Sequence, residues 1–221
     1  MTIGIRFNRL WPMMLALSCA LFFAPAVLAD PGDPVEQVRE SADRVMQLLR
    51  DNKERLSNDS NFVYELVEEE ILPLVDFEGM SRLILGRHWR TASPAQRERF
   101  VEAFRDTMVR AYAGQLAEHA DKRIIVNERR SRTDGNRATV ATEIVVGQGR
   151  SNIPVVYDMR VVDGQWKAFN LTVESWSLVT NFRTSFGAEI EGARDEAAGL
   201  EDLIQRLERR DRDLVEGAVG S

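Results

Sequence analysis

The residues best suited to chemistry form a short basic cluster, Arg87-His88-Trp89-Arg90. An arginine guanidinium can hold a phosphate through two hydrogen bonds, and an indole beside it offers a flat amphipathic platform. The pattern therefore suggests that Arg87 and Arg90 bind a phosphate group. In the alternative, structural interpretation, Trp89 anchors the core and both arginines pair with nearby acidic side chains.

Motifs for catalysis or metal binding are scarce in the rest of the chain. The two histidines, His88 and His119, belong neither to a His-Glu-x-x-His pair nor to a Cys/His cluster. No serine stands in a Gly-x-Ser-x-Gly elbow, and Gly147-Gln148-Gly149 lacks the third glycine and the lysine of a phosphate-binding loop. The glutamates at 68–70 are consecutive on a predicted helix and point around it. The sequence therefore predicts a binding protein without a metal or cofactor rather than an enzyme.

The first half of the chain shows helical periodicity up to about residue 119. The clearest helix begins at Ser93-Pro94-Ala95-Gln96, which is a capping box with proline at the first helical position. Its apolar residues then recur every four positions: Phe100, Phe104, Met108, Tyr112 and Leu116. Asp76 is placed to cap a shorter helix that Gly86 would end.

After Lys122 the apolar residues recur at every second position instead of every third or fourth, which predicts a sheet. Four strands are expected, at 123–130, 137–146, 153–161 and 166–173. Asp163-Gly164 is a two-residue hairpin signal, so the strands should form an antiparallel meander. Helical spacing returns at 178–190 and at 195–215. Helices before and after an antiparallel sheet indicate an α+β fold in which helices cover one sheet face.

The first 29 residues have the pattern of a secretory signal. Arg6 and Arg9 precede an apolar run, and Val27-Leu28-Ala29 places small residues before a cleavage site. We expect cleavage after Ala29 and a single mature domain, 30–221, with a helical part (30–122), a sheet (123–174) and C-terminal helices (175–216). A lipoprotein cleaved before Cys19 is the alternative, but Ala16-Leu17-Ser18 is a poor lipid-attachment box.

The composition limits the partners of the exported domain. Losing Arg6 and Arg9 changes the formal net charge from −6 to −8. An acidic surface argues against a general attraction to nucleic acid or to anionic bilayers. Cys19, the one cysteine, lies in the signal, so no disulfide is expected. No later segment has the roughly 20 apolar residues of a membrane span, which predicts a soluble protein, and we expect a monomer.

Two segments resemble the MlaC family of periplasmic phospholipid shuttles, also called toluene-tolerance proteins. The first is DFEGMSRLILGRHWR at 76–90, which runs on through Ser93-Pro94-Ala95-Gln96. The second is QWKAFNLTVE at 165–174, followed by SLVTNFRTSF at 177–186. The resemblance extends from about Asp33 to Leu207. Trp176 departs from it, because a small or aliphatic residue is expected there.

The resemblance implies a highly twisted sheet and helices that enclose an apolar pocket for phospholipid acyl chains, with the headgroup outside. It also implies docking to an outer-membrane lipoprotein-porin complex and to an inner-membrane ABC transporter with a ring-forming MCE-type subunit. The protein would carry phospholipid between these complexes in the periplasm, without chemistry on the lipid, and so maintain outer-membrane lipid asymmetry. Arg87 and Arg90 would then contact the headgroup.

The apolar periodicity gives candidate pocket residues. The sheet would contribute Val140, Ile144, Val155, Tyr157, Met159, Phe169, Leu171 and Val173, the last three if odd positions of the final strand face inward. The helical lid would contribute Phe104, Met108, Tyr112, Leu178 and Phe182. An ordinary filled core would show the same pattern, so that alternative stays open.

Two other classes of function stay open as well. The first is an exported hydrolase or isomerase on a cone-shaped α+β scaffold, with Asp158, Tyr157 or His88 as acid or base. It requires a polar cluster with perturbed pKa values inside the cavity. The second is a lipid-free adaptor between membrane complexes. The helix at 195–215 either packs on its own domain, docks a partner or gates the pocket.

Overall fold

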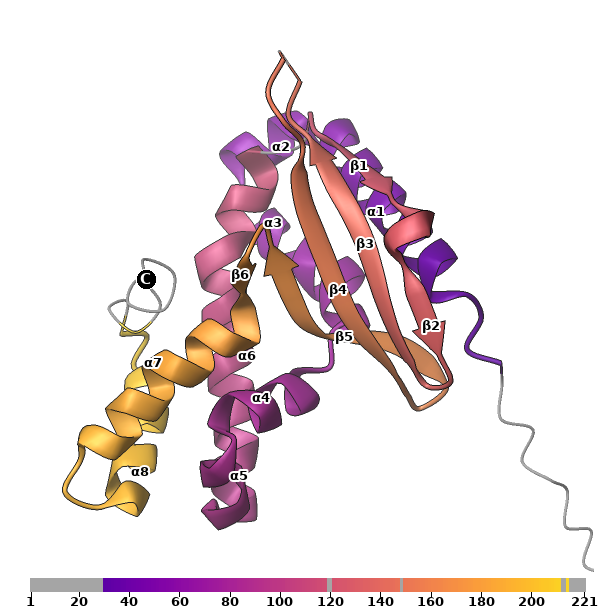
Figure 1. The fold of residues 1–221 in the computed structure, drawn as a ribbon. Helices are drawn as coiled ribbons and strands as arrows, with labels where there is room; N and C mark the ends of the chain where they lie inside the picture. The colour runs from indigo at the N-terminus through magenta and orange to yellow at the C-terminus, as the bar shows by residue number, and fades with distance from the viewer. Residues whose placement is uncertain (1–29, 119–120, 148, 212–213, 215–221) are drawn as a thin grey trace, which may run out of the picture.

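The computed structural model describes residues 30–118, 121–147, 149–211 and 214 (Figure 1). The expected signal peptide at 1–29 lies outside the described residues. The helices are α1 (Pro34–Asp51), α2 (Lys53–Asn58), α3 (Ser60–Leu66), α4 (Phe77–Leu85), α5 (Arg87–Thr91), α6 (Pro94–Glu118), α7 (Leu178–Gly192) and α8 (Glu196–Glu208). The strands are β1 (Arg123–Val126), β2 (Arg132–Asp134), β3 (Arg137–Val145), β4 (Ile153–Val162), β5 (Gln165–Val173) and β6 (Trp176–Ser177). No helix in the described ranges is long and apolar enough to cross a membrane.

The predicted α+β fold is confirmed, and its sheet has more strands than expected. The six strands pair antiparallel in the order β1-β3-β4-β5-β6, with β2 also on β3. The expected strand at 123–130 is broken, because Asn127 caps a 3-10 turn by accepting a hydrogen bond from the Arg130 backbone N–H. The chain rejoins the sheet as β2, and β6 adds a short strand at the opposite edge.

The register of the sheet defines its inner face, the side on which α1 packs. Two rows of cross-strand partners lie on this face: Val140, Tyr157 and Leu171, and beside them Thr142, Val155 and Val173. The register then shifts, so that Asp158 pairs with Asn170 and Met159 with Ala168. Phe169 is the residue inserted by this β-bulge. Odd positions of β5 therefore face inward only after the bulge, so the condition set for Phe169, Leu171 and Val173 is met by Leu171 and Val173.

The helix ends follow local capping signals. Asp76 Oδ1 accepts a 2.8 Å hydrogen bond from the Gly79 N–H at the start of α4, and Gly86 ends this helix with a φ of 53°. Ser93 and Gln96 exchange both hydrogen bonds of the predicted capping box, at 3.2 and 3.1 Å. These predictions are confirmed. The short helix α5, which follows Gly86 directly, was not predicted.

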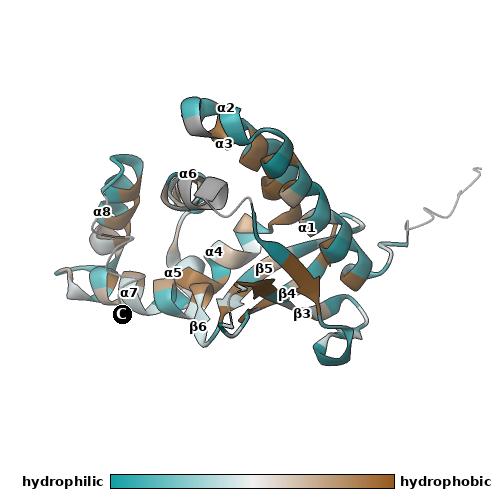
Figure 2. Cartoon of the chain, turned by 90° about the horizontal axis from the view of Figure 1, so that it is seen from above, coloured by the Kyte–Doolittle hydropathy of each residue, from teal (hydrophilic) through white to brown (hydrophobic). Residues whose placement is uncertain are grey.

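The helices pack in two groups around α6. One end of α1 covers the sheet, where Val35 and Val38 contact the cluster that contains Val140, Met159 and Trp166. The rest of α1 joins α2 and α3 against the middle of α6. The other group, here called the helical core, consists of α4, α5, α7 and α8 together with the apolar residues of α6 that they contact. Figure 2 shows α6 nearly end-on between the two groups.

Candidate functional site

The inner sheet face contains most of the expected pocket wall. Val140, Val155 and Met159 are buried, whereas four further wall residues are only half-buried: Ile144, Tyr157, Leu171 and Val173. Val140 and Met159 lie in the cluster that α1 covers, so this end of the face is filled by protein. Tyr157 packs against the same cluster, so Ile144, Leu171 and Val173 make the other part of the face the better candidate for ligand contact. Phe169, at the bulge, is separate from these rows.

The expected lid residues lie mainly in the helical core. Phe104 and Phe182 are fully buried, with ring centroids 5.3 Å apart in an edge contact. Phe100 and Phe186 complete a cluster of four rings. Met108 and Leu178 are buried in the same core, and Tyr112 packs at its edge. The structure therefore gives Phe104 and Phe182 the surroundings of a filled core, and their contact with a ligand stays a prediction.

Two side chains at the edge of the helical core bury unpaired polar atoms. Tyr112 Oη and Trp176 Nε1 are inaccessible and lack a hydrogen-bond partner in the described part of the chain. Both side chains pack at the edge of the helical core, as does Leu171. Burial raises the pKa of Tyr112. Trp176 was not predicted as a functional residue, although its departure from the family pattern was a signal.

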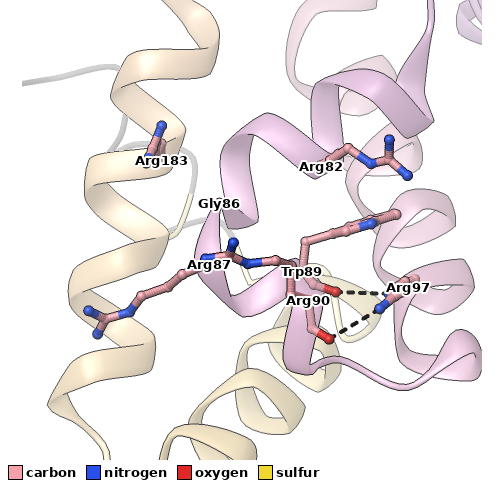
Figure 3. A pocket seen from close by; sticks show the side chains of 7 residues that line it. All are labelled: Arg82, Gly86, Arg87, Trp89, Arg90, Arg97 and Arg183. Atoms are coloured by element: carbon pink, nitrogen blue, oxygen red, sulfur yellow. Dashed lines mark hydrogen bonds between the residues drawn. The ribbon is translucent and has the colours of Figure 1, made fainter.

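A second candidate site, here called the arginine groove, has a volume of about 650 Å³ and lies at the junction of α4, α5, α6 and α7 (Figure 3). Its lining residues are Arg82, Gly86, Arg87, Trp89, Arg90, Arg97 and Arg183. The sequence pattern identified Arg87 and Arg90. The other three arginines were missed, because the fold brings them to this place from α4, α6 and α7.

Trp89 organises the arginine groove. Its buried ring lies between the guanidinium groups of Arg82 and Arg97, at 5.8 and 5.4 Å from the ring (Figure 3). Arg97 also donates hydrogen bonds to the carbonyl oxygens of Trp89, at 2.9 Å, and Arg90, at 3.3 Å. A Cβ at Gly86 would come within 3.3 Å of the Arg183 guanidinium, so glycine permits this close approach.

The two arginines predicted from the sequence have different surroundings. Arg87 forms ion pairs with Glu191, at 3.0 Å, and Glu196, at 2.9 Å. This agrees with the structural interpretation of Arg87. The Arg90 side chain is exposed and forms no ion pair within the described ranges. Binding of a phosphate or headgroup by either residue stays a prediction.

The proposed acid or base groups lie in separate environments. Asp158, behind the inner face, accepts hydrogen bonds from Thr139 Oγ1, at 3.1 Å, and Asn170 Nδ2, at 2.9 Å. Tyr157 points to the opposite face of the same strand, where burial raises its pKa. His88 is buried on α5, with Nδ1 3.4 Å from Glu196. The fold does not bring these three groups together as an acid–base pair.

Comparison with known proteins identifies one family. The MlaC protein family matches residues 39–209. The toluene tolerance protein ttg2D of Pseudomonas putida is 29% identical over 154 residues, which cover 69% of this chain and 71% of that protein. The intermembrane phospholipid transport system binding protein MlaC of Haemophilus influenzae is 21% identical over 183 residues, covering 77% and 86% of the two chains.

The fold also matches a solved structure. A phospholipid-binding protein from Ralstonia solanacearum, solved in complex with a phospholipid, superimposes with a TM-score of 0.71. The match covers 85% of this chain and 99% of that chain, at 22% identity. At this identity the likeness establishes the fold alone.

Proposed function

Because the chain belongs to the MlaC family, we propose that it is a soluble periplasmic carrier of phospholipid. It holds acyl chains against the inner sheet face and releases the lipid unchanged, without a cofactor. Its partners are an outer-membrane lipoprotein-porin complex and an inner-membrane ABC transporter with a ring-forming MCE-type subunit. Carriage between them maintains the lipid asymmetry of the outer membrane.

The observation that supports this function best is the incompletely covered apolar face. Ile144, Leu171 and Val173 are half-buried, although they continue the rows that α1 covers elsewhere. Tyr157 is desolvated enough to raise its pKa, yet its side chain keeps accessible surface. We take this combination as support for an incompletely filled space beside the strands.

The energetics of lipid transfer explain why such a face is needed. A diacyl lipid has on the order of 30 methylenes, and at about 0.8 kcal/mol each, exposing them to water would cost on the order of 20 kcal/mol. A carrier needs an apolar cavity and few polar groups inside it. The names of the Haemophilus and Ralstonia proteins, which refer to phospholipid transport and phospholipid binding, support the same ligand class.

A pair of substitutions on β4 tests the proposal. Tyr157→Glu puts a charge on the inner face, whereas Val156→Glu puts the same charge on the opposite face of the same strand. We expect Tyr157→Glu to lose copurified phospholipid, because a buried charge disfavours acyl chains, and Val156→Glu to retain it. Melting temperatures identify any variant that fails to fold. Equal retention by two folded variants would contradict the assigned face.

A further inference from the structure

The arginine groove adjoins a second depression, to which three glutamates contribute. This second one, here called the glutamate groove, has a volume of about 430 Å³. Its lining residues are Glu78, Arg82, Trp89, Pro94, Arg97, Glu98, Val101 and Glu102. Arg82, Trp89 and Arg97 belong to both grooves. The two grooves are therefore halves of one surface that Trp89 divides.

Most charged side chains of this surface form no ion pair within the described part of the chain, whereas Arg87 pairs with Glu191 and Glu196. Arg82, Arg90 and Arg183 are exposed and form no ion pair among the residues that the structure describes. The same holds for the three glutamates of the glutamate groove, Glu78, Glu98 and Glu102.

On α4 two of these charges lie on the same helix without pairing. Glu78 and Arg82 are four residues apart on this helix, a spacing at which opposite charges commonly pair. The Arg82 guanidinium lies over the Trp89 ring instead. Charges that the fold leaves unpaired on both sides of one aromatic residue are available to a partner.

The arginine groove lies away from the strands, whereas Glu78 of the glutamate groove is in the first turn of α4, which contacts β5. Helix α5 packs against α4 and α8, at the end of the helical group away from the strands (Figure 1). Tyr112 lies fifteen residues beyond Arg97 on α6, which is about 22 Å at 1.5 Å per residue. An occupant of the arginine groove would therefore not compete with a ligand on the sheet.

We propose that the two grooves form a docking surface for a segment of a partner protein. The segment presents an acidic residue to the arginine groove, where guanidinium forks suit a carboxylate, and a basic residue to the glutamate groove. Pro94 and Val101 offer apolar contact between these charges. As part of the proposed function, this surface would allow a membrane complex to bind the carrier while lipid occupies the sheet.

The observations favour a protein segment over a membrane surface. An anionic bilayer would be attracted by the arginine groove but repelled by Glu78, Glu98 and Glu102 beside it. Trp89 is buried, with 6% of its surface exposed, so it is not available to insert among lipids. A protein can match both signs at once.

Two charge-reversal variants of the full chain test the proposal. The first combines Arg90→Glu with Arg183→Glu, and the second combines Glu98→Lys with Glu102→Lys. Arg50→Glu with Arg194→Glu is the matched control, because both arginines are exposed, unpaired among the described residues and outside the grooves. Binding is measured to the two purified membrane complexes and to phosphatidylglycerol vesicles, and retained lipid is measured separately.

We expect both groove variants to bind at least one complex about tenfold or more weakly, with unchanged lipid retention and a control that binds like the original chain. A membrane-binding surface predicts opposite signs instead, because Glu98→Lys with Glu102→Lys would then strengthen vesicle binding. That result, or unchanged binding of both complexes by the groove variants, overturns the docking proposal. A chain that carries no lipid would overturn the proposed function instead, which keeps the two failures distinguishable.

Discussion

Asp76 and Arg160 join the first turn of α4 to the central strand β4. The Arg160 Nε donates a hydrogen bond to Asp76 Oδ2, while the other carboxylate oxygen caps the helix at Gly79. The Asp76 backbone N–H also donates to the Ala168 carbonyl on β5, at 2.9 Å. One buried carboxylate thus fixes the helical core to the sheet.

Asp76→Ala should therefore lower the free energy of unfolding. The change removes a helix cap, worth about 1 kcal/mol, and the charge-assisted hydrogen bond from the partly exposed Arg160, worth about 1.5–3 kcal/mol. Urea unfolding measures the effect. Glu78→Ala is the control, because this exposed acid in the same turn contributes only about 0.3–1 kcal/mol. A loss for Asp76→Ala no larger than that of the control would refute the assigned role.

Tyr112→Phe should stabilise the lipid-free protein. The Tyr112 hydroxyl is buried without a partner, and such a group carries a penalty of about 1–3 kcal/mol that phenylalanine avoids. Thermal unfolding of delipidated protein checks this expectation. Tyr64→Phe, at a residue with 36% of its surface exposed, should change the stability by less than about 0.5 kcal/mol. Destabilisation by Tyr112→Phe would show that the hydroxyl has a partner in solution.

The junction of α6 and α8 should make stability depend on pH. Arg99 hydrogen-bonds Glu201 at 2.8 Å and binds Glu208 through two bonds, at 2.8 and 2.9 Å. These bonds hold the pKa of both glutamates below their ordinary value of 4.5. The unfolded chain therefore binds more protons, so this contribution is complete above pH 4.5 and is lost as the pH falls through the lower, folded pKa values.

Arg99→Ala should accordingly lose less stability than the original chain between pH 5 and pH 3. Urea unfolding at a series of pH values measures the two slopes. Arg105→Ala is the control, because Arg105 pairs with its neighbour Asp106 on α6 and not with α8 among the described residues. Identical slopes for Arg99→Ala and the original chain would contradict the role of this junction.

Phe182→Ala and Leu171→Ala should separate core packing from ligand contact. Phe182 is fully buried among aromatic rings, so its truncation should lower the free energy of unfolding by about 3–5 kcal/mol. Leu171 is half-buried on the inner face, so its truncation should chiefly reduce lipid retention. Unfolding of delipidated protein and quantification of extracted lipid give the two readouts. A stable Phe182→Ala variant that loses lipid would show that Phe182 contacts the lipid, as expected of a lid residue.

Local sequence signals predicted much of the fold. The capping box at Ser93 and the hairpin at Asp163-Gly164 depend on residues a few positions apart, so the pattern contains the whole interaction. The break after Val126 also has a local cause, the Asn127 cap, which the alternation of apolar residues does not show. The bulge at Phe169 depends instead on pairing with β4. Periodicity within one strand does not contain that information.

The candidate sites were predictable only in part for the same reason. The alternation of apolar and polar residues along the strands placed Tyr157 and Leu171 on one face. It could not separate positions covered by α1 from positions left half-buried. The basic cluster drew attention to Arg87 and Arg90. Arg183 joins them from a helix almost a hundred residues later, through the approach to Gly86.

Native mass spectrometry of the purified original chain tests the central claim most directly. We predict a population with an added mass that matches phospholipid, which organic extraction removes and identifies, and transfer of that lipid between vesicles. A protein that purifies without lipid, takes none up from vesicles and transfers none would contradict the account.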